Sequence, residues 1–345
     1  MMKQLNGFQR GINLGGWLSQ CTPKKEHYDT FITEQDLRTI ASWGLDHVRL
    51  PIDYALVEQE DGTPREEGYR YIETCIEWCR TYGLHMILDL HNTAGYSFAD
   101  PDSSVRFFAD EGLRQRFREL WERLARRFSP YKETVLFELL NEVVDPRVYE
   151  DWNQLACETV ETIRNIDRDV PVMFGGVGYN SVSAVPLLRR PKGDNIAYTF
   201  HCYEPILFTH QGAPFTNGMP ESLRIDYPRP MEEYVEKTRQ YLDPLTLQNL
   251  GDLAGWTGLC NPDFFSTYFR QAVEKAEADG VALYCGEYGV IDRTAPQSVV
   301  NWYRDIHTAF EKAGIGRAAW TYRQMDFGIT DPHYDAVRDE LLTLL

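Results

Sequence analysis

Short apolar runs alternate with longer amphipathic stretches along almost the whole chain. Eight of these runs have the length and apolar character typical of buried strands. They cover residues 12–18, 47–52, 85–91, 134–142, 171–176, 196–203, 282–288 and 316–322. Between them, apolar residues spaced along one helix face predict helices over residues 33–43, 66–82, 113–128 and 148–167, and three more that begin near Pro262, Pro296 and His333. Thr33 and Asp36 resemble a capping box at the start of the first helix. This alternation predicts parallel βαβ units.

Polar residues recur at one place in this pattern, the C-terminal ends of the predicted strands. They are Arg49, His91, Asn141, Glu142, His201, Tyr203, Glu287 and Trp320. In a (β/α)8 barrel these ends converge on one rim, where the active site is built. Each residue alone could be structural, but their shared position predicts an α/β protein with a (β/α)8 TIM barrel, a single catalytic domain over residues 1–345. A doubly wound open sheet is the alternative, but no GxGxxG or Walker motif follows any strand.

The segment 207–259 interrupts the alternation after the sixth strand. It is longer than a bare loop of a compact domain, and it contains Pro, Gly and aromatic residues together with the charged helical stretch MEEYVEKTRQYL. We therefore predict a small insertion subdomain on the active-site rim. It could serve only packing, or it could form one wall of a substrate cleft.

The charge and composition narrow the possible partners. The 345 residues carry a net charge of −17, which argues against binding of nucleic acid, because phosphates require a basic surface. The same charge disfavours polyanionic substrates but does not repel a neutral polymer. Hydrophobic residues make up 43% of the chain, enough for a large core. Aromatic residues make up 13%; most belong in the core, and a surplus would suit a cleft that stacks rings against sugars.

The cysteines and the N-terminal sequence give expectations about location. The seven cysteines are odd in number and no pair has CxxC spacing, so we expect neither a disulfide framework nor a zinc site. The start MMKQLNGFQRGINLGG has no apolar core of a signal peptide, and no stretch has the length of a membrane span. We therefore expect a cytoplasmic monomer without a membrane partner, or a secreted protein if the sequence has been trimmed.

Two glutamates stand out among the residues at strand ends. Glu142 ends the fourth predicted strand and Glu287 lies near the end of the seventh, so the two carboxyl groups would face each other across the barrel. Glycoside hydrolysis needs such a pair, one protonated to act on the leaving oxygen and one ionised to attack the anomeric carbon or activate water. Glu138, in the same strand as Glu142, shows that a carboxylate here can also be structural.

The other polar residues suit supporting roles for this pair. Asn141 could donate to a sugar 2-hydroxyl, an interaction that strengthens in the transition state. Arg49 could lower the pKa of Glu287, and Tyr203 could orient its carboxylate. His201 could bond to Glu142 as it changes protonation state. Further side chains could contact the sugar: His91, Trp320, and as less certain candidates Asn92, Trp17 and Trp256.

Other chemistries have weaker support in the sequence. Asp89 and His91 could be metal ligands, but no second matching cluster accompanies DLH, so we expect no metal. A serine nucleophile would need a GxSxG elbow, which is absent. GGVG at residues 175–178 is a weak candidate for a phosphate cradle.

Seven segments, spread across nearly the whole chain, resemble glycoside hydrolase family 5, the endoglucanase family of clan A. They are GINLGGWL, HVRLP, DLHN, LLNEV, FHCY, CGEYGV and AAWTY. The resemblance implies a (β/α)8 barrel, retention of configuration, no metal and no organic cofactor. It makes Glu142 the acid/base and Glu287 the nucleophile, with Arg49, His91, Asn141, His201, Tyr203 and Trp320 in support. At Asn92 the chain departs from the second histidine often found at this place.

The resemblance defines the reaction more narrowly than it defines the sugar that is cleaved. It favours internal β-1,4-glucosidic bonds in cellulose-like chains or mixed-linkage β-glucan. The GINLGGWL start also occurs in β-1,3-glucanases of the family, and β-mannanases share the same catalytic residues. A barrel that binds carbohydrate without catalysis is the alternative from another class. It would usually lack one of the two carboxylates, and both are present.

Overall fold

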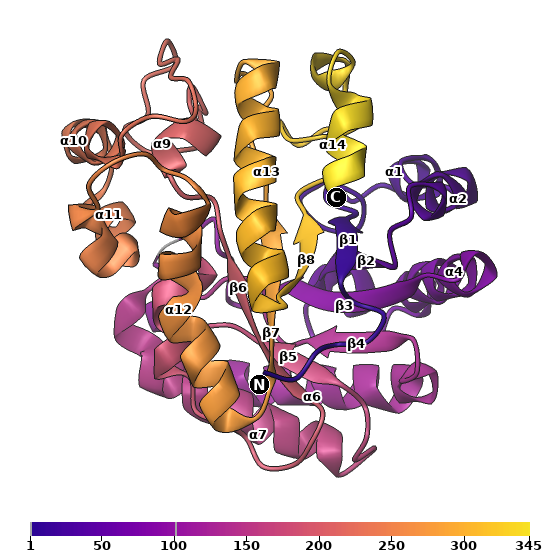
Figure 1. Ribbon diagram of the computed structural model, residues 1–345. Helices are drawn as coiled ribbons and strands as arrows, with labels where there is room; N and C mark the ends of the chain where they lie inside the picture. Colours follow the sequence, from indigo (N-terminus) through magenta and orange to yellow (C-terminus); the bar gives the residue numbers. More distant parts are fainter. Residues whose placement is uncertain (1, 101) are drawn as a thin grey trace.

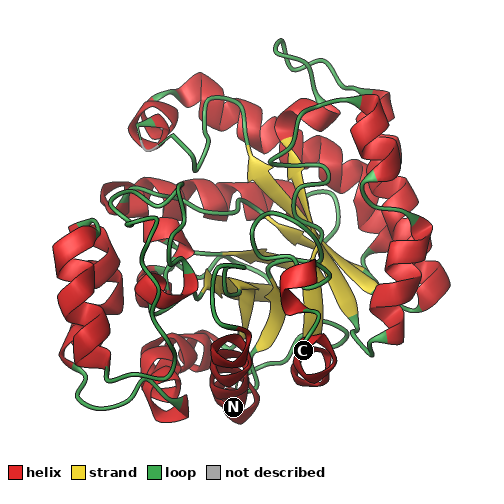
Figure 2. Ribbon diagram, turned by 90° about the horizontal axis from the view of Figure 1, so that it is seen from above, coloured by secondary structure: helices red, strands yellow, loops and turns green. Residues whose placement is uncertain are grey.

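The computed structural model describes residues 2–100 and 102–345. Eight parallel strands form a closed barrel, in which each strand pairs with the next along the chain and the last returns to the first (Figure 1). Figure 2 shows the strands at the centre of the molecule, surrounded by helices. The closed barrel confirms the predicted fold over the open sheet. The strands are β1 (Arg10–Asn13), β2 (His47–Asp53), β3 (His85–Asn92), β4 (Val135–Glu138), β5 (Val172–Phe174), β6 (Ile196–His201), β7 (Ala282–Tyr288) and β8 (Gly316–Ala319).

The longer helices cover the outside of the barrel, and shorter ones connect the strands to them. The longer ones are α2 (Glu34–Ser42), α4 (Glu66–Tyr82), α6 (Glu111–Phe128), α7 (Tyr149–Arg164), α12 (Pro262–Asp279), α13 (Pro296–Ala313) and α14 (Arg338–Leu344). The short α-helices are α1 (Lys25–Thr30), α3 (Tyr54–Val57), α5 (Ser103–Ala109) and α8 (Val177–Asn180). The 3-10 helices among them are η1 (Ser129–Tyr131), η2 (Pro146–Val148), η3 (Val182–Leu187) and η5 (Pro332–Tyr334).

The bounds of the helices follow from their terminal residues. α4 ends where predicted because Gly83 takes the left-handed conformation (φ 72°) that closes a helix. α6 begins two residues earlier than predicted because the Asp110 carboxylate accepts the backbone N–H groups of Gly112 and Leu113. At the start of α2, the Thr33 amide donates to the Asp36 carboxylate at 2.8 Å. The helix expected near His333 begins only at Arg338 and follows η5.

Five strands (β1, β4, β5, β6 and β8) end before their predicted C-terminal residue, and β1 and β4 bear most on the catalytic rim. β1 ends at Asn13 instead of residue 18, and the chain turns at Gly15 and at Gly16, whose φ is +78°. A Cβ on Gly15 would lie 2.8 Å from the Trp320 ring, so glycine is needed there for close approach. β4 ends at Glu138, but the Asn141 amide still donates to the Leu90 carbonyl at the end of β3. Glu142 therefore stays on the C-terminal rim.

The segment between β6 and α12 contains the helices α9 (Ile206–Thr209), α10 (Met231–Tyr241), α11 (Pro244–Leu250) and η4 (Gly251–Gly255). In Figure 1, α9–α11 lie together beside one end of α12. Asn249 in α11 donates to the carbonyl of Gly178, just after β5, at 3.0 Å. Because Gly178 follows the C-terminal end of a strand, this contact places α11 at the same rim as Glu142.

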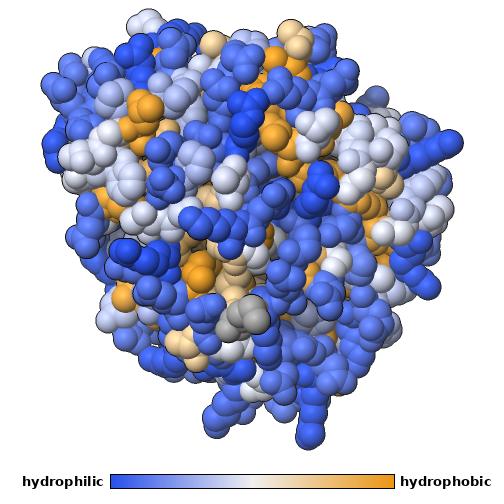
Figure 3. Space-filling view, in the orientation of Figure 1, coloured by the Kyte–Doolittle hydropathy of each residue, from blue (hydrophilic) through white to orange (hydrophobic). Residues whose placement is uncertain are grey.

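The surface is mostly hydrophilic on the face drawn in Figure 3, with small scattered apolar patches. The buried side chains form one large cluster between the strands and the helices, and a smaller one inside the barrel. All seven cysteines are free, and five of them are buried. Among the described residues, the helices are too short or too polar to cross a membrane.

Candidate active site

The two predicted glutamates lie side by side at the C-terminal rim. A carboxylate oxygen of Glu142, one of Glu287 and a ring nitrogen of His201 all lie within 4.8 Å of one another. His201 Nδ1 is 2.7 Å from Glu142 Oε1 and 3.6 Å from Glu287 Oε2. The carboxyl groups of retaining glycosidases are about 5–5.5 Å apart, and those of inverting enzymes about 6.5–9.5 Å. The observed closeness fits the first arrangement.

Arg49 joins these glutamates to the interior of the barrel. It is the third residue of β2, and so lies deeper in the barrel than the predicted position at the C-terminal end, with its side chain fully buried. Its guanidinium donates to Glu287 Oε1 at 2.8 Å and to both oxygens of Glu138 at 2.7 and 3.1 Å. It also lies 3.0 Å from Asp89 Oδ2. One buried cation thus faces three carboxyl groups.

The excess of carboxyl groups around Arg49 has an electrostatic consequence. Burial raises the pKa of Asp89 to about 7, although Arg49 opposes the rise. Burial likewise raises the pKa of Glu138 to about 7, again against the effect of Arg49. Taking a carboxylate out of water disfavours its ionised form, and one guanidinium does not compensate for three of them. These two buried groups therefore hold protons more tightly than ordinary carboxyl groups.

The two catalytic candidates differ in what surrounds them. Burial and the charge of Glu287 raise the pKa of Glu142 well above its usual value. Burial also raises the pKa of Glu287, while Arg49 lowers it as predicted and the hydrogen bond from Tyr203 lowers it further; burial outweighs both. Tyr203 donates to Glu287 Oε2 at 2.9 Å, so each oxygen of Glu287 accepts a hydrogen bond from the protein. Its ionised form is favoured relative to that of Glu142.

Asn141 and Asn13 complete the contacts of Arg49. The Oδ1 atoms of both amides accept from the guanidinium, at 2.8 and 2.9 Å. Because Oδ1 of Asn141 is occupied, its NH2 group is left to donate elsewhere, as a bond to a sugar 2-hydroxyl requires. Asn13 in turn donates to carbonyls of β8 and to the Gly286 carbonyl of β7.

His91 and Trp320 form one wall of the site. Their rings are nearly parallel (9°), with centroids 5.9 Å apart. Burial lowers the pKa of His91 to about 4, and its Nδ1 lies 2.6 Å from Asp89 Oδ2. A neutral His91 donates from Nδ1 to Asp89 and accepts at Nε2, where the amide of Gln20 lies 2.7 Å away. Gln20 is exposed, so a sugar hydroxyl can replace it.

The three less certain candidates for contact with the sugar, Trp17, Asn92 and Trp256, have other partners in the structure. Trp17 is only 1% exposed, its indole N–H donates to the Tyr28 carbonyl at 2.8 Å and its ring stacks on Trp78, so the possible role in substrate binding was wrong. Asn92 donates to Asp53 at 2.7 Å, which ties it to the end of the neighbouring strand β2. Trp256 packs edge-on against Phe264 at the start of α12.

Two further residues that support the site, Tyr96 and Tyr179, were not predicted from the sequence. The Tyr96 hydroxyl donates to the Glu142 carbonyl and accepts from the Val144 amide, which fixes the backbone that carries Glu142. The Tyr179 amide donates to the Val143 carbonyl at 3.2 Å, and the Tyr179 side chain is 39% exposed. Neither residue lies in a recognisable motif. The one signal that could have indicated Tyr96 and Tyr179 is their position as aromatic residues shortly after a strand.

The donor atoms of Glu142, His201 and Glu287 are close enough to surround a cation. However, both oxygens of Glu287 already accept from Arg49 and Tyr203, and a cation would have to approach a guanidinium 2.8 Å away. Asp89, considered with His91 as a ligand from the sequence, already contacts both His91 and Arg49. This set of donors suits proton transfer better than metal binding.

Comparison with known proteins adds independent findings. Residues 6–326 match the model of the cellulase family, glycosyl hydrolase family 5. The chain is 39% identical to Endoglucanase C of Acetivibrio thermocellus, with 98% of each chain covered. It is 39% identical to Cellodextrinase A of Ruminococcus flavefaciens, over 92% of this chain and 86% of that one. The solved structure of Thermotoga maritima Cel5A with mannotriose has the same fold, with a TM-score of 0.76, 24% identity and coverage of 98% and 97%.

Proposed function

The chain belongs to glycosyl hydrolase family 5, and from this premise we propose that it is a retaining endo-β-1,4-glucanase with Glu142 as acid/base and Glu287 as nucleophile. The observation that carries the proposal is the pair of neighbouring buried carboxyl groups with different surroundings. Glu142 has a strongly raised pKa, whereas Glu287 accepts hydrogen bonds from Arg49 and Tyr203 on its two oxygens.

In the first step, the protonated Glu142 gives its proton to the glycosidic oxygen while a Glu287 oxygen attacks the anomeric carbon. The bond to the leaving sugar breaks, and an ester joins the remaining sugar to Glu287. Asn141 supports this step, because its free NH2 group can donate to the 2-hydroxyl. Trp320, stacked on His91, offers the ring of this sugar an apolar surface.

In the second step, Glu142 is ionised and takes a proton from water, whose oxygen attacks the anomeric carbon and releases Glu287. The negative charge on Glu287, which raises the pKa of Glu142 in the free enzyme, is absent from the ester. The pKa of Glu142 therefore falls after the first step, as a change from acid to base requires.

The substrate we propose is an internal β-1,4-glucosidic bond in a soluble cellulose-like or mixed-linkage glucan. The names of the relatives at 39% identity, an endoglucanase and a cellodextrinase, support this choice. Rates on carboxymethylcellulose, lichenan, laminarin and mannan test it, with β-1,3-glucanase and β-mannanase activity as the alternative outcomes.

Replacing the nucleophile tests the mechanism directly. We expect Glu287→Gln to lower kcat on barley β-glucan by about 10⁴-fold or more while oligosaccharide binding persists, because the amide cannot form the ester. Glu158→Gln, an exposed glutamate of α7, is the matched control and should keep full activity. Near-wild-type hydrolysis by Glu287→Gln, or an α-anomer as the first product seen by proton NMR, would overturn the mechanism.

A further inference from the structure

Two buried polar atoms face the same glycine next to the proposed acid/base. Thr199 and His201 lie two residues apart on β6, so their side chains share one face of the strand. A Cβ built on Gly286, in the neighbouring strand β7, would lie 3.0 Å from both Thr199 Oγ1 and His201 Nε2. Because glycine has no side chain, both polar atoms can approach the Gly286 backbone closely, and we call the place where they meet the Gly286 notch.

Neither polar atom has a hydrogen-bond partner among the described residues, and both side chains are buried. A buried polar atom without a partner destabilises the folded protein, so a site with two of them is expected to be satisfied by solvent. Since both atoms lie 3.0 Å from one point, they are at most about 6 Å apart. One water at hydrogen-bonding distance from each can bridge such a pair.

We propose that the Gly286 notch binds one water, through which the Thr199 hydroxyl holds His201 in the tautomer that donates from Nδ1 to Glu142. Thr199 donates to the water oxygen, and the water donates to the lone pair of His201 Nε2. Nδ1 then carries the ring proton and points at Glu142 Oε1, 2.7 Å away. Thr199 is thus a positioning residue for the acid/base.

The tautomer matters because Glu142 must be an acid in one step and a base in the next. With the proton on Nδ1, His201 donates to Oε1 in both steps and leaves Oε2 for the reacting oxygen. With the proton on Nε2, Nδ1 would accept the Glu142 proton and turn it away from the substrate. It would then face the ionised Glu142 with a lone pair, which is repulsive.

Burial keeps the His201 ring neutral, so its surroundings decide which ring nitrogen carries the proton. Burial lowers the pKa of His201 well below its usual value, and Arg49 of β2 and His91 of β3 add to this effect. Glu142, after β4, and Glu287, on β7, are the carboxyl groups that face the ring. These two carboxyl groups favour a proton on Nδ1, and a donor at Nε2 strengthens that preference.

The inference rests on the proposed acid/base role of Glu142, and variants at Thr199 test it separately. Thr199→Val keeps the shape of the side chain and removes the hydroxyl, and Thr199→Ser keeps the hydroxyl. We expect Thr199→Val to lower kcat/KM on β-glucan about 10-fold, as a partial loss of acid–base catalysis. We expect its basic pH limb to move upward, because the ionised Glu142 loses the N–H donor. Thr199→Ser should behave like the wild type.

Thr199→Ala separates the water from mere packing. The smaller side chain leaves room for a second water that can replace the hydroxyl, so Ala should impair the enzyme less than Val. A purely structural role predicts the opposite order, because Ala removes more of the buried side chain. Thr159→Val is the matched control, since Thr159 is also buried and its hydroxyl donates to a carbonyl within α7.

Nitrogen NMR of ¹⁵N-histidine-labelled enzyme reads the tautomer directly, with His201 assigned from a His201→Asn sample. We expect the Nδ1–H form in the wild type and in Thr199→Ser, and a shift toward Nε2–H in Thr199→Val. An unchanged tautomer and pH profile in Thr199→Val, or a larger loss in Ala than in Val, would overturn the inference. Such a result would not affect the proposed function, which is tested separately by the wild-type rate and by Glu287→Gln.

Discussion

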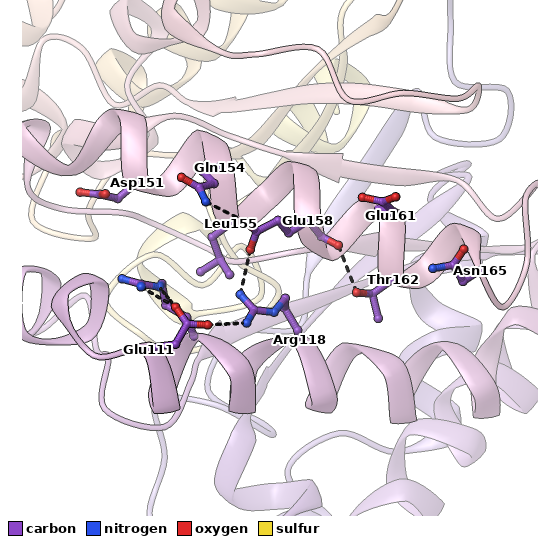
Figure 4. A pocket seen from close by; sticks show the side chains of 10 residues that line it. Glu111, Arg118, Asp151, Gln154, Leu155, Glu158, Glu161, Thr162 and Asn165 are labelled. Carbon is purple, nitrogen blue, oxygen red and sulfur yellow. Dashed lines mark hydrogen bonds and ion pairs between the residues drawn. The ribbon is translucent and has the colours of Figure 1, made fainter.

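Two regions of this protein pair arginine with glutamate, and they behave in opposite ways. One is the barrel interior, where Arg49 meets three carboxyl groups and every partner is buried. The other is the groove between α6 and α7, about 460 Å³ in volume, which we call the α6–α7 groove (Figure 4). Its lining residues are Glu111, Arg114, Arg118, Asp151, Gln154, Leu155, Glu158, Glu161, Thr162 and Asn165.

The distances in the two regions are almost the same. In the groove, Arg118 lies 2.7 Å from Glu111 and 2.8 Å from Glu158, and Figure 4 shows it directed at both. Yet Arg118 and then Arg114 lower the pKa of Glu111, whereas the pKa of Glu138 rises to about 7 although it touches Arg49. Water around the groove removes the cost of ionisation, and its exclusion from the barrel imposes that cost. Burial, more than the shape of a cavity, therefore distinguishes the reactive region here.

The largest effect is expected from removing the buried guanidinium of Arg49. We expect Arg49→Met to lower kcat/KM on β-glucan by about 10³-fold and the free energy of unfolding by about 3–5 kcal/mol at pH 8, because three buried carboxyl groups lose the guanidinium that pairs with them. Initial rates and urea unfolding measure the two effects. Arg49→Lys keeps the charge with fewer donors and should fall between Met and the wild type. A stable, active Arg49→Met enzyme would show that the buried ion pairs of Arg49 matter no more than the exposed ones of the α6–α7 groove.

A smaller effect, on the pH dependence of stability, is expected from removing one of the three carboxyl groups around Arg49. The folded-state pKa of Glu138, about 7, exceeds the ordinary value of 4.5, so the folded protein binds this proton more tightly than the unfolded chain does. Its contribution to stability is complete below about pH 4.5 and is lost as the pH rises through 7. Glu138→Gln should therefore make stability less dependent on pH between 5 and 8, by about 2 kcal/mol over that range. Urea unfolding at four pH values measures this, and an unchanged slope would contradict it; Glu158→Gln, in the groove, should keep the wild-type slope.

The smallest effect is expected in the groove itself. Exposed ion pairs contribute about 0–1 kcal/mol, and salt screens them. Arg118→Ala should thus lower the free energy of unfolding by less than about 1 kcal/mol, with still less effect in 0.5 M NaCl, and leave kcat/KM unchanged. Thermal unfolding and β-glucan hydrolysis check both statements. A tenfold loss of activity would show that the α6–α7 groove takes part in the reaction after all.

Much of the fold was predictable because local signals set it. The bounds of α4 could be read from its apolar spacing and the glycine after it. Residues at strand ends indicated the catalytic rim because the barrel topology brings those ends together. The two glutamates, Arg49, Asn141, His201 and Tyr203 all meet there, as predicted.

What could not be predicted depends on contacts across the barrel. In the sequence, Asn13 is a single polar residue in an apolar strand. Its partner Arg49 is 36 positions away, so no local pattern indicates their contact. The number of carboxyl groups that share Arg49, and the resulting pKa of Asp89, follow from packing in three dimensions. Trp17 was misplaced because a tryptophan after a strand can face either the cleft or the helices. The turn at Gly15 and Gly16 directs it to the helices.

The contact between Asn249 and the Gly178 carbonyl has a consequence for how such an enzyme can diversify. All of the residues assigned to the two chemical steps lie on strands or directly after them, outside the segment from α9 to η4. This segment could therefore exchange sequence and length with those of related enzymes while bond cleavage stays intact. Grafting it, with Asn249 and the His210 ring against Tyr203 retained as anchors, is a practical route to variants that share one reaction but release products of different lengths.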